Sequence, residues 1–195
     1  MLGLPQRSDA PIISIVSRLV NSKGIDLIAQ VLDEILQMDV QIIVLGTGEL
    51  KYEELFKAAA LKYKDKISAN ICFSNNLAHK IYAASDLFLM PSLFEPCGLG
   101  QLIALRYGAI PIVRETGGLK DTIVSYNEFT GEGNGFSFLN YNAYDMLFTI
   151  KRAISFYNNK EAWDNIYSNA IHSDYSWKQS AEEYIQLYNR LIVSK

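Results

Sequence analysis

Residues 12–36 read IISIVSRLVNSKGIDLIAQVLDEIL, and this stretch decides the fold. Its first five residues form a short, largely β-branched and apolar run, which is typical of a strand. After a polar loop, apolar residues recur at helical spacing, at Ile28, Val31, Leu32, Ile35 and Leu36. The stretch therefore predicts a strand, a loop and a helix in that order, which is the unit from which parallel sheets are built.

The same unit repeats down the chain, with apolar runs and helical segments in alternation. The expected strands are residues 12–16, 42–45, 69–73, 87–90, 110–113 and 136–138. Helical segments between the later strands are residues 77–84, 99–107 and 119–126. The strands are apolar at nearly every position, and this pattern indicates a parallel sheet that is covered on both faces. We expect an α/β fold with a doubly wound parallel sheet of about six strands.

The last third of the chain, residues 143–193, shows helical spacing only. Its final helix is the best defined, because Ser176 and Gln179 have the spacing of a capping box. The apolar stripe of that helix consists of Trp177, Ala181, Tyr184, Ile185, Tyr188, Leu191 and Ile192. We therefore expect carboxyl-terminal helices after the sheet.

The composition is that of a globular protein. Of 195 residues, 49% are hydrophobic and 20% are charged, which excludes a disordered or fibrous chain. The formal net charge of -3 removes the strong electrostatic argument for nucleic acid, so we expect no nucleic-acid partner. No apolar run reaches the length of a membrane span, and the first residues lack the features of a secretory signal. We expect a cytoplasmic protein with no membrane partner.

The cysteines and histidines give no sign of a disulfide framework or a metal centre. Cys72 and Cys97 cannot form such a framework and lack metal-type spacing, which favours a reducing compartment. His79 and His172 have no cysteine or acidic partner at ligand spacing. We therefore expect no metal site.

Ligands in open α/β sheets bind at the carboxyl ends of the strands, so the residues that follow each expected strand are the candidates. After the first strand, Arg18 and Lys23 lie five positions apart in a loop that enters a helix. An arginine and a lysine so placed can clamp a diphosphate, although two solvated surface charges would give the same pattern. After the second strand, Gly46 and Gly48 flank Thr47 and would let a nucleotide approach the backbone, or would serve only the turn.

Two further loops lead into helix starts that suit oxygen ligands. After the fourth strand, Glu95 precedes Pro96 and the next helix. Its carboxylate can accept hydroxyl protons from a sugar, and free backbone N–H groups can bind sugar or anionic oxygens. The alternative for Glu95 is an acid favoured by the helix dipole. After the fifth strand, Thr116, Gly117 and Gly118 suit phosphate, and the alternative is a plain turn.

The motifs around these loops occur together and in order. They are Ser17-Arg18-Leu19 with Lys23-Gly24, Pro91-Ser92 with Glu95-Pro96-Cys97-Gly98-Leu99, Arg106-Tyr107-Gly108, and Thr116-Gly117-Gly118-Leu119 with Asp121-Thr122. Together they resemble the carboxyl-terminal domain of bacterial glycogen synthases and plant starch synthases. These enzymes are retaining glycosyltransferases of the GT-B fold, in which this domain is one Rossmann-like half. The resemblance runs from about Leu2 to Ile192.

The resemblance implies an enzyme that transfers glucose from ADP-glucose to the non-reducing end of an α-1,4-glucan. It implies retention of configuration and no metal ion or cofactor. Arg18 and Lys23 would hold the diphosphate and stabilise the negative charge that develops on the leaving group. One departure is that related families often have a second glutamate eight positions after Glu95, where this chain has Ile103, so a two-glutamate site is not expected.

The resemblance also assigns the remaining candidates. Glu95 would bind glucose hydroxyls. The backbone N–H groups that help it would be those of Cys97, Gly98 and Leu99. Thr116 and the two glycines after it would sit against phosphate, and Phe73 would stack on the adenine ring.

The resemblance further divides the chain into a remnant of an interdomain linker, residues 1–10, and a donor-binding domain, residues 11–195. The amino-terminal acceptor domain, through which the α-1,4-glucan would bind, has no counterpart here. We therefore expect this chain to bind ADP-glucose without elongating glucan. In this family the last helix crosses back to the missing domain, so we expect part of its apolar stripe to be exposed. If the chain comes from a plant, the resemblance implies that the protein is found in a plastid and not in the cytoplasm.

Two other functions stay open at this point. One is a GT-B transferase that uses UDP-glucose, of the sucrose or trehalose-phosphate synthase type. The other is a stand-alone nucleotide-binding module with no catalytic partner. A clear preference for UDP-glucose in calorimetry would favour the first.

Overall fold

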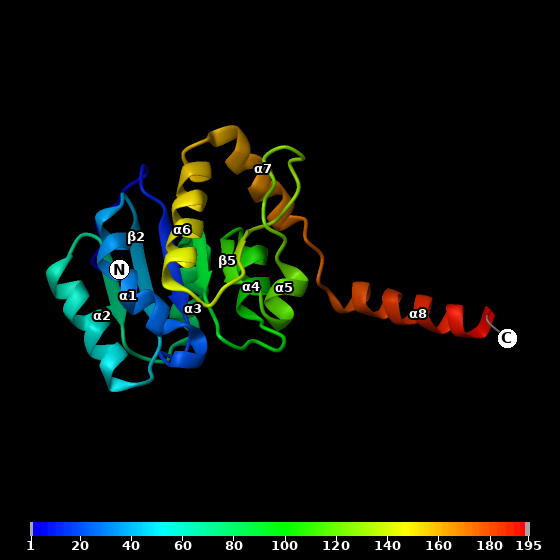
Figure 1. Ribbon diagram of the computed structural model, residues 1–195, viewed down its shortest axis with the longest axis horizontal. Coiled ribbons are helices and arrows are strands. Elements are labelled where there is room, and N and C mark those ends of the chain that lie inside the picture. Colours follow the sequence, from blue (N-terminus) through cyan, green and yellow to red (C-terminus); the bar gives the residue numbers. More distant parts are fainter. Residues whose placement is uncertain (1, 194–195) are drawn as a thin grey trace.

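All strands of the central sheet run parallel in the computed structural model, which describes residues 2–193 (Figure 1). The strands are β1 (Ile12–Val16), β2 (Gln41–Leu45), β3 (Ile67–Asn70), β4 (Leu87–Met90), β5 (Ile110–Arg114) and β6 (Phe136–Phe138). The helices are η1 (Asn21–Lys23), α1 (Ile25–Gln37), α2 (Leu50–Lys62), α3 (Asn75–Ala84), α4 (Gly100–Tyr107), α5 (Gly117–Thr122), α6 (Ala143–Tyr157), α7 (Lys160–Ile171) and α8 (Trp177–Val193). Three residues lie outside the described part of the chain. They are Met1, which belongs to the expected linker over residues 1–10, and Ser194 and Lys195, which belong to the expected donor-binding domain over residues 11–195.

The sheet has the strand order β3-β2-β1-β4-β5-β6. The chain adds strands outward from β1 on one side and then from β4 on the other. The order therefore reverses between β1 and β4, and the loops after these two strands diverge there. This topology confirms the predicted doubly wound α/β fold, and it brings the predicted ligand loops to one edge of the sheet.

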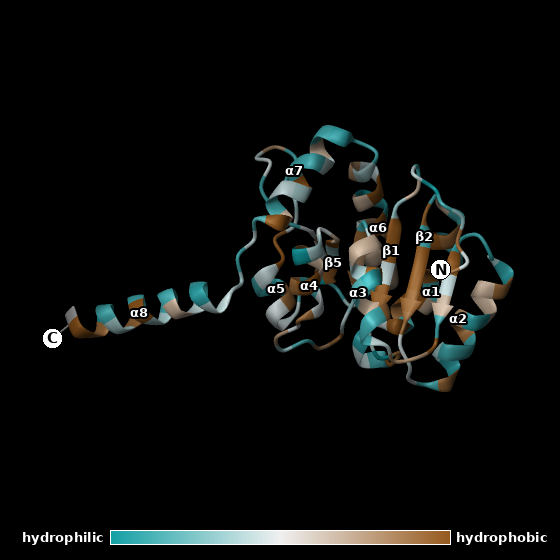
Figure 2. Cartoon of the chain, turned by 180° about the vertical axis from the view of Figure 1, so that it is seen from behind, coloured by the Kyte–Doolittle hydropathy of each residue, from teal (hydrophilic) through white to brown (hydrophobic). Residues whose placement is uncertain are grey.

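Helices cover both faces of the sheet. On one face lie α1, α2 and α6, and on the other lie α3, α4 and α5 (Figure 1, Figure 2). The strands between these layers are hydrophobic along most of their length, and Phe56, Phe88 and Phe136 are fully buried. Cys72 and Cys97 are both free thiols. Apolar burial between the layers therefore holds the fold without a disulfide.

The third strand differs from its prediction. The sequence predicts a strand over residues 69–73, whereas β3 spans Ile67–Asn70. The predicted bounds are wrong because the apolar run continues to Phe73 whereas the pairing with β2 ends at Asn70. The Cys72 N–H donates back to the Asn70 carbonyl at 3.0 Å, which ends the strand, and the Phe73 side chain is 85% exposed. Phe73 thus lies at the ligand edge of the sheet rather than in the core.

The helix after β5 is shorter than predicted. The sequence predicts a helix over residues 119–126, whereas α5 spans Gly117–Thr122. The helix ends there because the backbone becomes extended at Ile123. The Tyr126 N–H then donates to the Gly135 carbonyl at 2.8 Å, just before β6. Local pairing with the strand that follows therefore outweighs the helical pattern in this segment.

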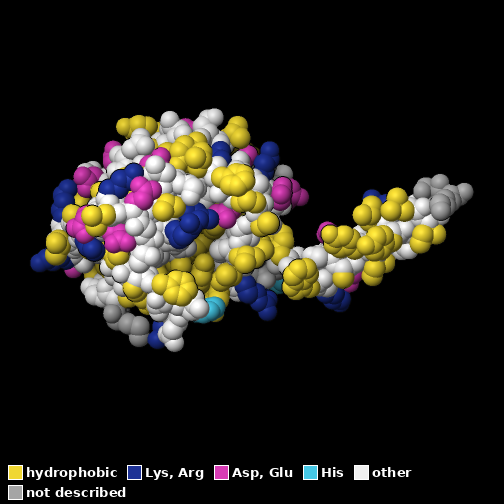
Figure 3. All heavy atoms as spheres, turned by 90° about the horizontal axis from the view of Figure 1, so that it is seen from below, with side chains coloured by type: hydrophobic (Ala, Val, Ile, Leu, Met, Phe, Trp, Pro, Cys, Tyr) yellow, Lys and Arg dark blue, Asp and Glu magenta, His cyan; other side chains and the backbone are white. Residues whose placement is uncertain are grey.

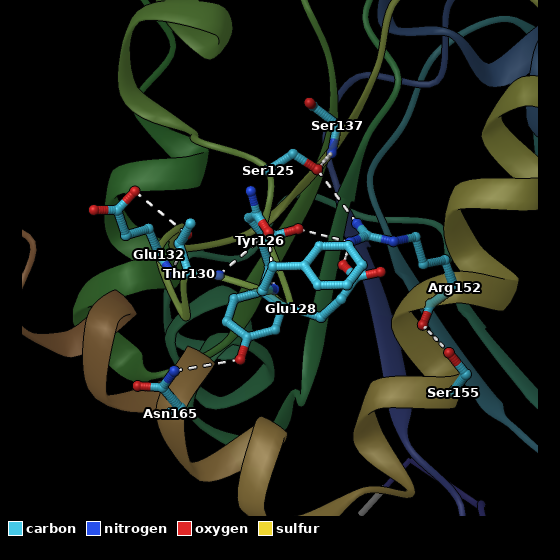
Figure 4. A network of polar contacts seen from close by, with 11 residues as sticks. Ser125, Tyr126, Glu128, Thr130, Glu132, Ser137, Arg152, Ser155 and Asn165 are labelled. Carbon is cyan, nitrogen blue, oxygen red and sulfur yellow. Dashed lines mark hydrogen bonds and ion pairs between the residues drawn. The ribbon is translucent and has the colours of Figure 1, made fainter.

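Arg152 of α6 fastens the loop between α5 and β6 (Figure 4). Its guanidinium donates to the Tyr126 carbonyl at 2.6 Å and to the Glu128 carboxylate at 2.8 Å. It also lies over the ring of Phe136, 5.5 Å from the centroid. From α7, Asn165 donates to the Tyr126 hydroxyl at 3.3 Å. Two helices therefore hold this loop in place.

Helix α8 projects away from the rest of the molecule (Figure 1). Its apolar side chains gather on one side, which faces the viewer in Figure 3. The exposed members of this stripe are Trp177, Ala181, Tyr184, Ile185, Tyr188, Leu191 and Ile192. The predicted exposure is confirmed. Within residues 2–193, no helix has the length and hydrophobicity that a membrane crossing requires.

The predicted capping box before α8 forms only in part. The Ser176 hydroxyl accepts the Gln179 N–H at 3.4 Å, as expected. The Gln179 side chain, however, donates to Glu183 at 3.2 Å instead of returning to Ser176. The i,i+4 contact on the exposed helix has therefore replaced the reciprocal half of the box.

Hydrogen exchange should separate α8 from the sheet. Because α8 has few contacts that bury its backbone, we expect its amides to exchange roughly tenfold or more faster than those of β1 and β4. Exchange with mass-spectrometric detection on the 195-residue chain measures this. Equal protection of α8 and the central strands would contradict the exposed arrangement.

Candidate functional site

Two adjoining hollows open at the carboxyl end of β1, on the edge of the sheet seen in Figure 3. Val16 and Ser17 line both of them. The first hollow has a volume of about 210 Å³ and the second about 250 Å³. They share a wall at the point where the strand order reverses, which is where ligands bind in open α/β sheets.

An ion pair lies in the first hollow. Lys23 Nζ donates to Glu95 Oε2 at 2.5 Å, and the two side chains are only 21% and 11% exposed. The Ser92 hydroxyl donates to the same carboxylate oxygen at 3.1 Å. Because both charges are largely withdrawn from water, removal of either partner would leave the other charge partly buried without a counterion. The structure thus brings together two predicted site residues from loops 72 positions apart.

Backbone contact fixes the two loops that carry this ion pair. Gly24 has a φ of +73° and lies so close to Pro91 that a Cβ at position 24 would be 2.1 Å from the Pro91 carbonyl oxygen. The Leu93 N–H donates to the Ser22 carbonyl at 3.1 Å. Glycine is the residue that permits both the left-handed backbone and this close approach. The loop after β1 and the loop after β4 therefore form one unit.

Arg114, the last residue of β5, supports the same unit. Its guanidinium donates to the carbonyls of Ser92 at 2.9 Å and Leu93 at 2.5 Å, and it lies over the Tyr141 ring, 5.6 Å from the centroid. Arg114 directly follows the expected strand 110–113, yet the sequence analysis missed it, because only the glycine-containing turn at residues 116–118 was considered there. The signal that could have found it is a cation at the end of an otherwise apolar strand.

The second hollow combines an aromatic ring with exposed backbone. Phe73 lines it together with Arg18 and Gly46. A Cβ at Gly46 would be 1.8 Å from the Ser17 carbonyl oxygen, so only glycine fits there. Within residues 2–193, the exposed Arg18 guanidinium has no ion-pair partner. This hollow can therefore offer a stacking surface and a free cation to a ligand.

Gly48 lies behind this hollow and does not line it. A Cβ at position 48 would be 2.2 Å from the Leu19 carbonyl oxygen, and the Gly48 N–H donates to Glu53 at 2.9 Å. Gly48 thus supports the loop that carries Arg18. Its contact with a nucleotide stays a prediction.

The loop after β4 packs directly on the start of α5. A Cβ at Gly117 would be 2.2 Å from the Glu95 carbonyl oxygen, and one at Gly118 would be 1.8 Å from the Cys97 carbonyl oxygen. The Gly118 N–H donates to the Glu95 carbonyl at 3.1 Å. Thr116 and these glycines line neither hollow. The glycines therefore serve loop packing, which the sequence analysis missed, and their contact with phosphate stays a prediction.

Free backbone N–H groups lie at the start of α4. Those of Cys97, Gly98 and Leu99 donate to no residue within 2–193, and Leu99 lines the first hollow. N–H groups at a helix start can bind hydroxyl or anionic oxygens. Tyr82 lines the same hollow, and burial raises the pKa of its hydroxyl to about 12, which keeps it protonated at neutral pH.

Six of the twelve predicted catalytic and binding residues line the two hollows. The predicted residues that line the two hollows are Arg18, Lys23, Gly46, Phe73, Glu95 and Leu99. A ligand that spans both hollows would meet an aromatic ring and glycine backbone at one end, and a carboxylate, a hydroxyl and free N–H groups at the other. It would also meet one cation in each hollow, Lys23 in the first and Arg18 in the second. No group of three or more metal-ligating side chains occurs in the described part of the chain, and the absence of a metal stays a prediction.

Comparison with known proteins identifies relatives over nearly the whole chain. Residues 3–172 match the family model described as "Glycosyl transferases group 1". The chain is 60% identical over 192 residues to the glycogen synthase of Clostridium novyi (strain NT), covering 98% of this chain and 40% of that protein. The glycogen synthase of Desulforamulus reducens gives the same identity and coverage. The chain thus spans about 40% of the length of the curated relatives it matches.

Solved structures agree with this fold. The catalytic domain of starch synthase IV from Arabidopsis thaliana, bound to ADP and acarbose, is 36% identical with a TM-score of 0.86, over 97% of this chain and 40% of that one. Sucrose-phosphate synthase from Thermosynechococcus elongatus is 20% identical with a TM-score of 0.68, over 97% of this chain and 47% of that one. The second likeness concerns the fold alone.

The contact between α5 and the loop after β4 predicts the effect of Gly118→Ala. The new Cβ would meet the Cys97 carbonyl oxygen at 1.8 Å, so the backbone must shift. We expect the free energy of unfolding to fall by about 1–3 kcal/mol, as in other overpacked sites. Urea denaturation measures it. Gly100→Ala is the control, since its Cβ would meet only side-chain atoms, the Met90 sulfur and the Phe88 ring, both at 3.2 Å, which a small side-chain shift relieves. Equal stability of both variants would contradict the account.

Proposed function

The chain belongs to the group 1 glycosyl transferases and matches the carboxyl-terminal domain of bacterial glycogen synthases, and from this premise we propose that it binds the sugar donor of such an enzyme. The donor we propose is ADP-glucose, and the reaction is transfer of its glucose to the non-reducing end of an α-1,4-glucan with retention of configuration. The observation that carries the proposal is the Lys23–Glu95 ion pair in a hollow that adjoins a second one lined by Phe73 and Arg18.

The second hollow suits the nucleoside. The exposed Phe73 ring can stack on adenine, and the glycine backbone at Gly46 lets a flat base or ribose approach closely. The starch synthase of Arabidopsis thaliana, which has the same fold at 36% identity, binds ADP. An adenine nucleotide is therefore the ligand we propose for this hollow.

The first hollow suits the glucose. The Glu95 carboxylate can accept hydrogen bonds from sugar hydroxyls, and the free N–H groups of residues 97–99 can donate to the sugar oxygens. Ser92, which donates to Glu95, holds the carboxylate in one orientation. Orientation of this kind places the anomeric carbon and its leaving group in a fixed position for transfer.

Arg18 and Lys23 flank the boundary between the hollows, where the diphosphate of such a donor would lie. As the bond from the anomeric carbon to the diphosphate breaks, negative charge grows on the departing oxygen. The two cations stabilise that charge more than they stabilise the intact donor, which lowers the barrier. The reaction we propose needs no metal ion and no cofactor.

The acceptor is proposed to bind largely outside this chain. Starch synthase IV binds acarbose, and the curated relatives extend well beyond the part that this chain matches. We therefore propose that residues 11–195 form the donor-binding part, after a linker over residues 1–10, and that glucan contacts come mainly from another domain. The cytoplasm is the compartment we propose, by analogy with bacterial glycogen synthases.

Calorimetry with ADP-glucose and UDP-glucose tests the donor. We expect ADP-glucose to bind more tightly, and Arg18→Ala to weaken it by roughly 10- to 100-fold, because a hydrogen bond to a charged group contributes about 1.5–3 kcal/mol. Arg106→Ala is the control, an exposed arginine on the last turn of α4. A clear preference for UDP-glucose would instead favour a transferase of the sucrose or trehalose-phosphate synthase type.

A glucan elongation assay tests whether this chain binds only the donor. With radiolabelled ADP-glucose and a maltooligosaccharide, we expect no detectable elongation by the 195-residue chain, because the two hollows are proposed to hold the donor and not the acceptor. Addition of glucose at the rate of an intact glycogen synthase would defeat this part of the proposal.

A further inference from the structure

Gln101 is fully buried on the first turn of α4, directly behind the loop that follows β4. Its side-chain amide faces three acceptors. Nε2 lies 3.2 Å from the Cys97 carbonyl oxygen, 3.1 Å from the Gly98 carbonyl oxygen and 3.2 Å from the Thr122 hydroxyl. The amide therefore ties the loop to its own helix and to α5 at once.

The other half of this amide has no partner. Within residues 2–193, Gln101 Oε1 is the buried side-chain polar atom that lacks a hydrogen bond. Turning the amide over would place this oxygen against the carbonyls of Cys97 and Gly98, so the present orientation is the one that the loop requires. The amide thus directs its donor group to the loop and to α5 and leaves its acceptor without a protein partner.

The hydrogen bonds of Gln101 determine where two backbone N–H groups point. In a planar trans peptide, the N–H points opposite to the C=O of the same unit. The carbonyls of Cys97 and Gly98 are turned inward to Gln101, so the N–H groups of Gly98 and Leu99 are turned away from it. Leu99 lines the hollow that contains Lys23 and Glu95.

Gly98 fits the Gln101 side chain closely. It has a φ of +72°, and a Cβ at this position would be 2.5 Å from Gln101 Oε1. The glycine thus lets the loop turn over the buried amide, and the amide in turn holds the loop in that turn. The two residues act as a pair.

We propose that Gln101 is a positioning residue, which aims the N–H groups of Gly98 and Leu99 at the glucose hydroxyls of the donor. This inference rests on the proposed function. Gln101 lines neither hollow and so does not touch the ligand itself. It acts through the two peptide units that its amide holds.

The test compares Gln101→Met with a matched control, Gln41→Met. Gln41 is also buried, and its Nε2 donates to the carbonyls of Pro5 at 2.9 Å and Asp65 at 3.2 Å, at the start of β2 and far from the hollows. Methionine has a similar length and cannot donate a hydrogen bond. Each variant is titrated with ADP and with ADP-glucose by calorimetry, and unfolded in urea.

We expect Gln101→Met to weaken the binding of ADP-glucose by about tenfold, because the N–H groups that contact the sugar are misdirected. The affinity for ADP should change by less than about twofold. Gln41→Met should lower stability and leave both affinities unchanged. If Gln101→Met weakens the binding of ADP as much as that of ADP-glucose, or changes the affinity for neither ligand, the positioning role is wrong.

Failure of the proposed function has a separate signature, which is that the unsubstituted chain binds neither ligand. Backbone amide order parameters then decide the inference alone, since the N–H groups of residues 97–99 have no hydrogen bond, in the part of the chain that the structure describes, whose opening exchange could report. In that case lower order parameters at Gly98 and Leu99 in Gln101→Met, and not in Gln41→Met, would support the positioning role. Unchanged order parameters there would overturn it.

Discussion

The Lys23–Glu95 ion pair is the interaction on which the rest of the site depends. The strand order reverses between β1 and β4, so the loops after these strands would otherwise part at the middle of the sheet. A salt bridge this far withdrawn from water contributes little net stability, because desolvation offsets the attraction. Its value is geometric. It sets a cation and a carboxylate side by side in the first hollow.

Tight backbone packing makes that geometry possible. Gly24 against Pro91, and Gly118 against Cys97, bring three loops closer than any side chain would allow. Arg114 then binds the carbonyls of the loop after β4 from the side. The site is thus held by contacts between backbones, and its functional side chains extend from a rigid frame.

The sequence predicts the sheet well because its strands are buried on both faces, so apolar runs mark them directly. The rule that ligands bind after strands also finds Arg18, Lys23 and Glu95. It misses Gln101, whose partners depend on how the loop before α4 and α5 meet, which no local pattern records. The same limit explains β3, where the apolar run continues past Asn70, the residue at which the pairing of the backbone ends.

The central claim is that the two hollows at the end of β1 bind one nucleotide sugar. Amide chemical shifts of the isotope-labelled chain during titration with ADP-glucose test it most directly. The account predicts shifts at residues 17–24, 46–47, 73–75 and 93–100, with residues 2–8 at the opposite edge unchanged. Shifts confined to that opposite edge, or no shifts at saturating ligand, would contradict it.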